Sequence, residues 1–202
     1  MTGPERVYYD RRAAEYDDWY LGTGQFAQRI RPGWAEELAV LKATLASLRF
    51  ISLLDVACGT GFLTASLSGT VVGLDQSASM LGIARSRVPS GAFVQGDALR
   101  LPFQAQQFDC LMTGHFYGHL DHTARALFLA EARRVSRCLL IIDAAQREDV
   151  PPEEHQERVL NDGSRHVVYK RYFTPERLSA ETGSGRTLHA GRWFVALLVN
   201  TS

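Results

Sequence analysis

Short apolar runs alternate with helical stretches along the middle of the chain, and this alternation constrains the fold more than any other feature of the sequence. The runs typical of buried strands lie at 50–56, 71–74, 92–95, 108–113 and 138–143. Between them, helical spacing of apolar residues follows Gly61 (through Leu67), Ser77 and Asp121. Strands that alternate with helices pair in parallel and are covered by helices on both faces. We therefore expect an α/β fold with a Rossmann-like, mostly parallel, seven-stranded sheet.

The N-terminal segment has a different pattern. Its aromatic and small residues step by three or four positions and so predict one helical face; they are Tyr9, Ala13, Tyr16 and Tyr20. Apolar residues between Trp34 and Leu48 have the same spacing and predict a second amphipathic helix. We expect these helices, within residues 1–49, to form an N-terminal cap on the rest of the domain.

The C-terminal segment departs from strict alternation. A double proline predicts a polar helix over 151–160, and residues 166–173 have an extended pattern. Residues 186–189 and 193–199 predict an antiparallel hairpin, so the sheet is expected to end in a reversed strand. We expect a single domain over 1–202, in which 50–145 form the core and 146–202 a further segment with the terminal hairpin.

Charge and cysteine content limit the classes of function. Lysine plus arginine and aspartate plus glutamate each number 22, which argues against nucleic acid as the main partner because phosphate binding needs a basic surface. The three cysteines show neither a CxxC pair nor zinc spacing, which is typical of buried thiols in a reducing compartment. The apolar runs are too short to span a membrane, and the first residues do not resemble a signal peptide. We expect a cytoplasmic protein, monomeric or homodimeric.

A glycine turn follows the first predicted strand and is succeeded by two acids at the ends of the next two strands. Gly59 and Gly61 form a turn that is predicted to open a helix, where backbone N–H groups approach a ligand closely. Asp75 can accept hydrogen bonds from both hydroxyls of a ribose, and Asp97 from an adenine amino group. Since parallel strands end at one edge of a sheet, these features predict a nucleoside site. A dinucleotide site prefers a third glycine, where this chain has Thr64.

These segments resemble successive motifs of the class I S-adenosylmethionine-dependent methyltransferases. The resemblance lies in DVACGTGFLT (55–64), VVGLDQS (71–77), QGDALRLPF (95–103), the Tyr9–Asp17 pattern and the stretch from Phe108 to Leu120. It covers about residues 9–143, and more loosely 172–178 and the remainder. It implies S-adenosyl-L-methionine as cofactor and a small-molecule acceptor as partner, with 50–145 as the cofactor-binding core and 146–202 as the acceptor-side segment. Ala57 departs from the glycine or glutamate that many members carry.

The resemblance also implies which residues bind the cofactor. Backbone of the glycine turn would lie against its methionine and ribose, Asp75 would bind the ribose, and Asp97 with the Ala98 N–H would bind the adenine. Tyr16 would cover the cofactor from the N-terminal helices. The full expected set is Tyr16, Asp55, Ala57, Gly59, Thr60, Gly61, Asp75, Gln76, Met80, Asp97, Ala98, Gly114 and His115.

Methyl transfer depends mainly on alignment, so a catalytic base is needed only when the acceptor loses a proton. His115 is the candidate base because it follows the fourth strand, and the alternative is that it only packs against the cofactor or forms part of the wall. The basic and aromatic segment 153–173 is expected to form the acceptor wall or a solvated surface. Two alternatives remain open, an NAD(P)-dependent oxidoreductase and a non-catalytic nucleoside-binding regulatory protein.

Overall fold

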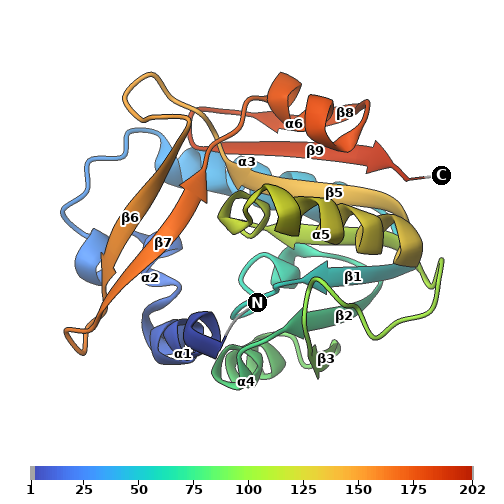
Figure 1. Cartoon of the computed structure of the whole chain (residues 1–202), viewed down its shortest axis with the longest axis horizontal. Coiled ribbons are helices and arrows are strands. Elements are labelled where there is room, and N and C mark those ends of the chain that lie inside the picture. The colour runs from blue at the N-terminus through green and yellow to red at the C-terminus, as the bar shows by residue number, and fades with distance from the viewer. Residues whose placement is uncertain (1–2, 202) are drawn as a thin grey trace.

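The computed structural model describes residues 3–201 and contains one seven-stranded sheet with a two-stranded hairpin beside it (Figure 1). Strand order in the large sheet is β3-β2-β1-β4-β5-β9-β8. The first five strands are parallel, whereas β9 is antiparallel to both of its neighbours. The strands are β1 Ser52–Val56, β2 Thr70–Asp75, β3 Ala92–Gln95, β4 Phe108–Gly114, β5 Ser136–Ala144, β8 Gly185–Ala190 and β9 Phe194–Asn200. The expected Rossmann-like fold with its terminal antiparallel hairpin is confirmed.

Helices cover both faces of this sheet, with α3 behind it and α5 in front in Figure 1. The α-helices are α1 Gly3–Arg12, α2 Asp18–Leu21, α3 Trp34–Ser47, α4 Ala78–Arg87, α5 His122–Val135 and α6 Pro175–Thr182. Side-chain caps fix where two of them begin, because Ser77 accepts a hydrogen bond from the Met80 N–H and Asp121 from the Ala124 N–H. Each helix of the described chain is too short or too polar to cross a bilayer.

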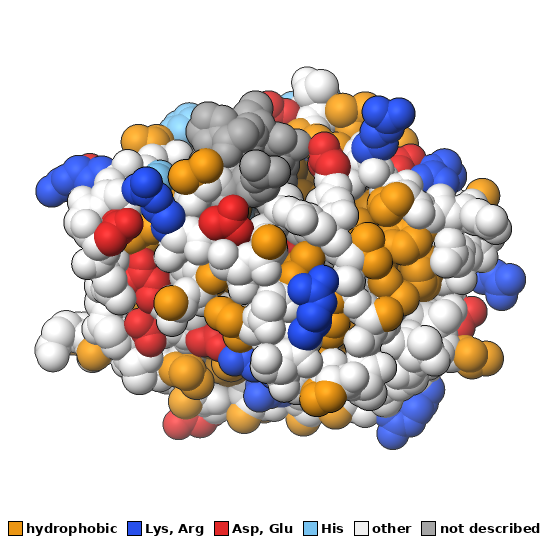
Figure 2. Space-filling model, turned by 90° about the horizontal axis from the view of Figure 1, so that it is seen from below, with side chains coloured by type: hydrophobic (Ala, Val, Ile, Leu, Met, Phe, Trp, Pro, Cys, Tyr) orange, Lys and Arg blue, Asp and Glu red, His pale blue; other side chains and the backbone are white. Residues whose placement is uncertain are grey.

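Alternate residues of the central strands supply the two halves of the core. In β5, Leu139 and Ile141 pack on the side of α5, while Leu140 and Ile142 pack on the side of α3. A strand that is buried on both faces has a nearly continuous apolar sequence, which explains the run at 138–142. Figure 2 shows the molecule from below the view of Figure 1, and on this face basic and acidic side chains are scattered among apolar and polar ones.

The prediction of a helix through Leu67 after the glycine turn is wrong. Only a three-residue 3₁₀ turn, Thr64–Ser66, forms there, and Leu67 is already extended. The Thr64 hydroxyl donates to the buried Asp55 carboxylate, which holds the segment against β1. The chain must enter β2 at Thr70 and so has no length for further helical turns.

The expected polar helix over 151–160 is also wrong. Residues Glu153–Val159 form β6, which pairs antiparallel with β7, Arg165–Arg171. Opposite charges lie across the hairpin, where Glu153 meets Arg171 at 3.1 Å and Glu157 meets Arg165 at 2.9 Å. Cross-strand pairs of this kind stabilise strands. The full ladder of pairs with β7, from Glu153–Arg171 to Val159–Arg165, makes this segment a strand despite the helix-start signal of the two prolines.

The N-terminal helical face is interrupted rather than continuous. Helix α1 ends at Arg12, a 3₁₀ turn follows over Ala13–Glu15, and α2 is one turn long. The expected second helix is confirmed as α3.

Candidate functional site

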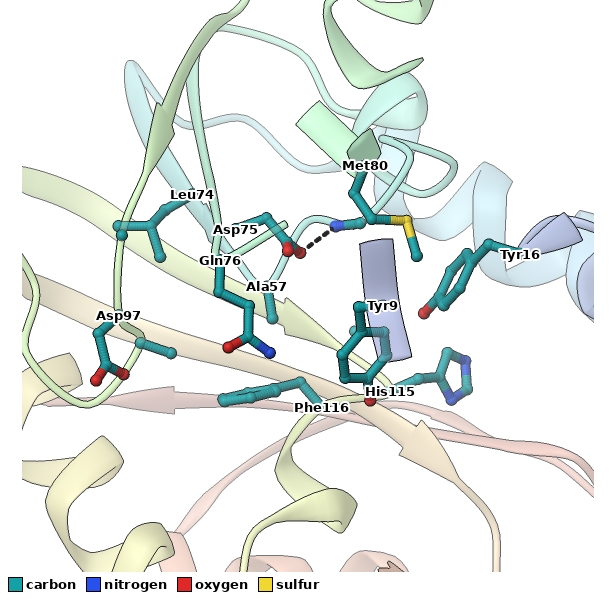
Figure 3. A pocket seen from close by; sticks show the side chains of 14 residues that line it. Tyr9, Tyr16, Ala57, Leu74, Asp75, Gln76, Met80, Asp97, His115 and Phe116 are labelled. Atoms are coloured by element: carbon teal, nitrogen blue, oxygen red, sulfur yellow. Dashed lines mark hydrogen bonds between the residues drawn. The ribbon is translucent and has the colours of Figure 1, made fainter. Parts of the chain in front are cut away.

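A cleft opens at the carboxyl ends of β1, β2, β3 and β4. Strand β1 lies between β2 and β4, so the order of the sheet reverses there, and ligands of open α/β sheets bind at such a point. The cleft is lined by Tyr9, Tyr16, Ala57, Gly59, Leu74, Asp75, Gln76, Met80, Gly96, Asp97, Ala98, Gly114, His115 and Phe116. Figure 3 shows Asp97 and Leu74 at one end of the cleft and Tyr9, Tyr16 and His115 at the other.

Backbone geometry forms the floor of the cleft. Ala57, Gly59 and Gly61 have φ values of 57°, 54° and 74°, in the left-handed region that favours glycine. A Cβ on Gly59 would lie 3.4 Å from the Tyr16 ring, and one on Gly61 would lie 3.3 Å from Ala84. The first glycine therefore keeps the cleft open, whereas the second allows close packing of α4.

Asp75 ends β2 and lies at the centre of the cleft. One carboxylate oxygen accepts from the Gly59 N–H at 2.8 Å (Figure 3), and the other accepts from the Ser77 N–H at 2.9 Å. Burial raises the pKa of Asp75, and these backbone donors act in the opposite direction. Since a carboxylate has about four acceptor positions, two remain for ligand hydroxyls.

The Asp97 end of the cleft has apolar walls. The Asp97 carboxylate accepts from the Leu99 N–H at 2.9 Å, which orders the loop after β3. Leu74 and Phe116 flank the space between this acid and Gln76, as expected for a flat aromatic ligand (Figure 3).

Asp55 lies beneath the glycine turn and faces a second, smaller hollow. That hollow is shared with Tyr16, Tyr20 and Met112. Burial raises the pKa of Asp55 to about 7; the hydrogen bond from Thr64 lowers it and the charge of Asp75 raises it further.

Most of the residues expected at the site line the cleft, and three do not. Besides Asp55, they are Gly61, which packs on α4, and Thr60, whose hydroxyl donates to Asp17 at 2.6 Å and accepts from Arg87 at 2.9 Å. Four lining residues were not expected from the sequence: Tyr9, Leu74, Gly96 and Phe116. The sequence contained a signal for each of them. Tyr9 shares the predicted helical face of Tyr16, and Leu74, Gly96 and Phe116 are each next in sequence to an expected site residue.

His115 stands where the cleft meets a second space. Its φ of 55° is unusual for a residue other than glycine, and both of its buried ring nitrogens are without a hydrogen-bond partner among the described residues. Its Nδ1 lies 4.0 Å from the Asp143 carboxylate, which also pairs with Lys170 at 2.6 Å. Burial lowers the pKa of His115 to about 3; Asp143 opposes this effect and Lys170 adds to it. The imidazole is therefore neutral at pH 7 and retains a free lone pair.

The second space is a cavity of about 400 Å³, a size typical of small-molecule pockets. It shares Tyr9, Tyr16 and His115 with the cleft, so the two spaces adjoin at these three residues. Its other walls are Arg12, Trp19, Phe26, Arg29, Ile30, Arg31, Trp34, His119, Ala144, Arg147, Asp149, Gln156, Arg158, Lys170, Tyr172 and Trp193.

The β6–β7 hairpin therefore borders this cavity, as expected of segment 153–173, through Gln156, Arg158 and Lys170. Trp34 serves both as core and as wall: it is 7% exposed and its indole N–H donates to the Tyr20 carbonyl at 2.8 Å.

Comparison with known proteins identifies relatives of this chain. A family model described as a methyltransferase domain matches residues 53–138, which run from β1 into β5. The chain is similar to a dTDP-3-amino-3,6-dideoxy-alpha-D-glucopyranose N,N-dimethyltransferase of Streptomyces fradiae, with 42% identity over 206 aligned residues that cover 100% of this chain and 69% of the relative.

A demethylmenaquinone methyltransferase of Lactococcus lactis subsp. lactis (strain IL1403) is 39% identical over 82 residues, 35% of this chain and 32% of the relative. The chain thus matches only about a third of the length of that protein. Among solved structures, the DhpI–SAM–HEP complex has a TM-score of 0.75 and 24% identity, covering 96% of this chain and 94% of that chain. This likeness shows a shared fold.

Proposed function

Because this chain belongs to the class I S-adenosylmethionine-dependent methyltransferases, we propose that it binds S-adenosylmethionine in the cleft at Asp75 and methylates a small molecule held in the adjoining cavity. The observation that carries the proposal is that cleft and cavity meet at Tyr9, Tyr16 and His115. When bound, S-adenosylmethionine supplies a methyl group on a sulfonium, which leaves as a neutral thioether. The relative from Streptomyces fradiae, a methyltransferase of a nucleotide-linked amino sugar by name, supports a small-molecule acceptor.

The residues of the cleft fit this cofactor. The ribose hydroxyls would donate to the two free acceptor positions of Asp75, and the adenine would lie between Gln76 and Phe116. Its amino group would donate to Asp97, and the Ala98 N–H would donate to a ring nitrogen. Gly59 leaves room for the ribose because even a methyl group there would contact the Tyr16 ring.

The reactive end of the cofactor would then lie beside His115. Tyr16 and Trp19 exclude water, and the walls orient the acceptor for in-line attack, which can lower the barrier by about 7–11 kcal/mol. The walls would hold the acceptor's nucleophilic atom in line with the carbon–sulfur bond of the cofactor, whose electron pair would stay on sulfur as the methyl group is transferred. Where the acceptor must lose a proton, neutral His115 is the group placed to accept it. Burial lowers the pKa of His115, and the charge of Asp143 would oppose this by stabilising the imidazolium.

Calorimetric titration tests the cofactor. We expect S-adenosylhomocysteine to bind at micromolar concentration and NAD, as the control ligand, not to bind. Binding of NAD alone would refute the proposal in favour of hydride-transfer chemistry.

Transfer of label from methyl-labelled S-adenosylmethionine tests the reaction. We expect the label in the small-molecule fraction of a metabolite extract. Label that enters only nucleic acid or protein would contradict the proposed acceptor class.

A further inference from the structure

Positive side chains are concentrated in the acceptor cavity although the chain as a whole carries no net charge. Six lysine or arginine residues line it, against one acidic residue, Asp149. Two of the six are already neutralised, since Lys170 pairs with Asp143 at 2.6 Å and Arg147 with Asp149 at 2.9 Å. The remaining four cations are Arg12, Arg29, Arg31 and Arg158.

Arg12 and Arg158 are the two most informative of these cations. Arg12 is 8% exposed, its guanidinium donates to the Tyr8 hydroxyl and it lies 5.1 Å from the centre of the Tyr16 ring. Arg158 is half-buried and is oriented by the side-chain oxygen of Gln156, at 2.6 Å from one of its terminal nitrogens. Across the described part of the chain, neither guanidinium has a carboxylate within ion-pair distance.

Two acids that lie near this pair have other partners. Glu15 and Glu157 line a small hollow together with Arg12 and Arg158. The Glu15 carboxylate accepts from the Asn161 N–H at 3.1 Å, and Glu157 pairs with the exposed Arg165. The charge of Arg12, together with burial, lowers the pKa of Arg158, so the two cations repel each other.

Two neighbouring guanidinium groups, one buried and one half-buried, cost free energy unless an anion joins them. Planar guanidinium groups bind phosphoryl oxygens through paired, charge-assisted hydrogen bonds. We propose that Arg12 and Arg158 bind a phosphoryl group of the acceptor, such as a phosphate ester, phosphonate or diphosphate, and so direct its nucleophile toward His115. This inference rests on the proposed function, because it identifies the chemical class of the acceptor for that same site.

The test uses inorganic pyrophosphate as the probe, titrated calorimetrically with and without saturating S-adenosylhomocysteine. The variant is Arg158→Gln, and the matched control is Arg137→Gln, an arginine that is 67% exposed and outside the cavity. We expect at least a tenfold loss of pyrophosphate affinity in Arg158→Gln and less than a twofold change in Arg137→Gln. S-adenosylhomocysteine affinity should be unchanged in both variants.

Melting temperature gives a second readout that a purely structural arginine would not produce. Removing a repelled cation should leave the melting temperature of Arg158→Gln equal to or above that of the unsubstituted protein, while anion affinity falls. A lower melting temperature together with unchanged pyrophosphate affinity would refute the proposal.

Further outcomes separate this inference from the proposed function. If S-adenosylhomocysteine binds but pyrophosphate does not, or both variants bind it alike, the phosphoryl site is refuted and the proposed function stands. If malonate binds more tightly than pyrophosphate, the anion is a carboxylate and the phosphoryl assignment is wrong. If pyrophosphate binds but S-adenosylhomocysteine does not, the proposed function fails, and with it the assignment of this anion site to an acceptor.

Discussion

Replacing Asp55 with asparagine should change how the stability of the protein depends on pH. Asp55 is 2% exposed, and one of its carboxylate oxygens accepts from the Thr64 hydroxyl at 2.5 Å. Burial raises the pKa of this carboxyl to about 7. Asparagine has nearly the same shape and keeps an acceptor for Thr64, but it cannot ionise. The variant therefore removes the titration and little else.

The sign follows from the two protonation states. In the unfolded chain the pKa of this carboxyl is near 3.8. Above that pH, folding must either protonate the carboxylate again or bury it as a charged group, and both cost free energy. The stability contributed by protonated Asp55 is complete below pH 3.8 and is lost as pH rises through 7. One pKa unit corresponds to about 1.4 kcal/mol. The resulting penalty is about 2 kcal/mol at pH 5 and about 4 kcal/mol at pH 8, so Asp55→Asn should gain about 2–3 kcal/mol on the unsubstituted protein across this interval.

Urea unfolding between pH 5 and pH 8 measures this difference, because the other titrating groups cancel between the two proteins. Asp162→Asn is the control. The pKa of Asp162 is lowered, so this carboxylate is fully ionised throughout the interval, and the difference in unfolding free energy between this variant and the unsubstituted protein should stay constant. If the difference in unfolding free energy for Asp55→Asn is equally independent of pH, the conclusion that Asp55 is buried with a raised pKa is wrong.

Three further substitutions test the site. Asp75→Ala should weaken S-adenosylhomocysteine binding by about 1–3 kcal/mol in calorimetry, because the ribose loses a charged hydrogen-bond partner; unchanged affinity would remove Asp75 from the site. Gly59→Val should abolish binding while the circular dichroism spectrum is kept, since even a Cβ would lie 3.4 Å from the Tyr16 ring; retained binding would mean that the turn faces away from the ligand. His115→Asn tolerates the left-handed backbone and should lower kcat about 10²–10⁴-fold for an acceptor that must lose a proton, with S-adenosylhomocysteine affinity kept; an unchanged kcat would show that His115 only forms part of the wall.

Much of the cofactor cleft could be predicted from the sequence because its signals are local. Gly59 lies where a strand ends in a tight turn, and Asp75 and Asp97 each follow an apolar run by one or two residues. Parallel strands bring their carboxyl ends to one edge, so three local patterns define one cleft. Tyr9 and Phe116 carried weaker signals of the same kind.

Two local patterns failed where tertiary contacts were stronger. The two prolines before Glu153 favour a helix start, yet pairing with β7 makes this segment a strand. The apolar residues after Gly61 favour a helix, yet the hydrogen bond from Thr64 to Asp55 holds them in a short turn.

The sequence by itself determined the alternating strands and helices, the glycine turn and the acids at the strand ends, because each depends on residues that are close along the chain. Only the tertiary structure formed the cavity that we propose for the acceptor. Arg12 and Arg158 are 146 positions apart in the sequence, and they line one wall only because α1 and the β6–β7 hairpin fold to the same side of the sheet (Figure 1). His115 likewise becomes the junction of two spaces through its burial against Trp19 and its proximity to Asp143. Burial and charge pairing across such separations have no periodic signature in a single sequence, and they set the chemistry of the acceptor site.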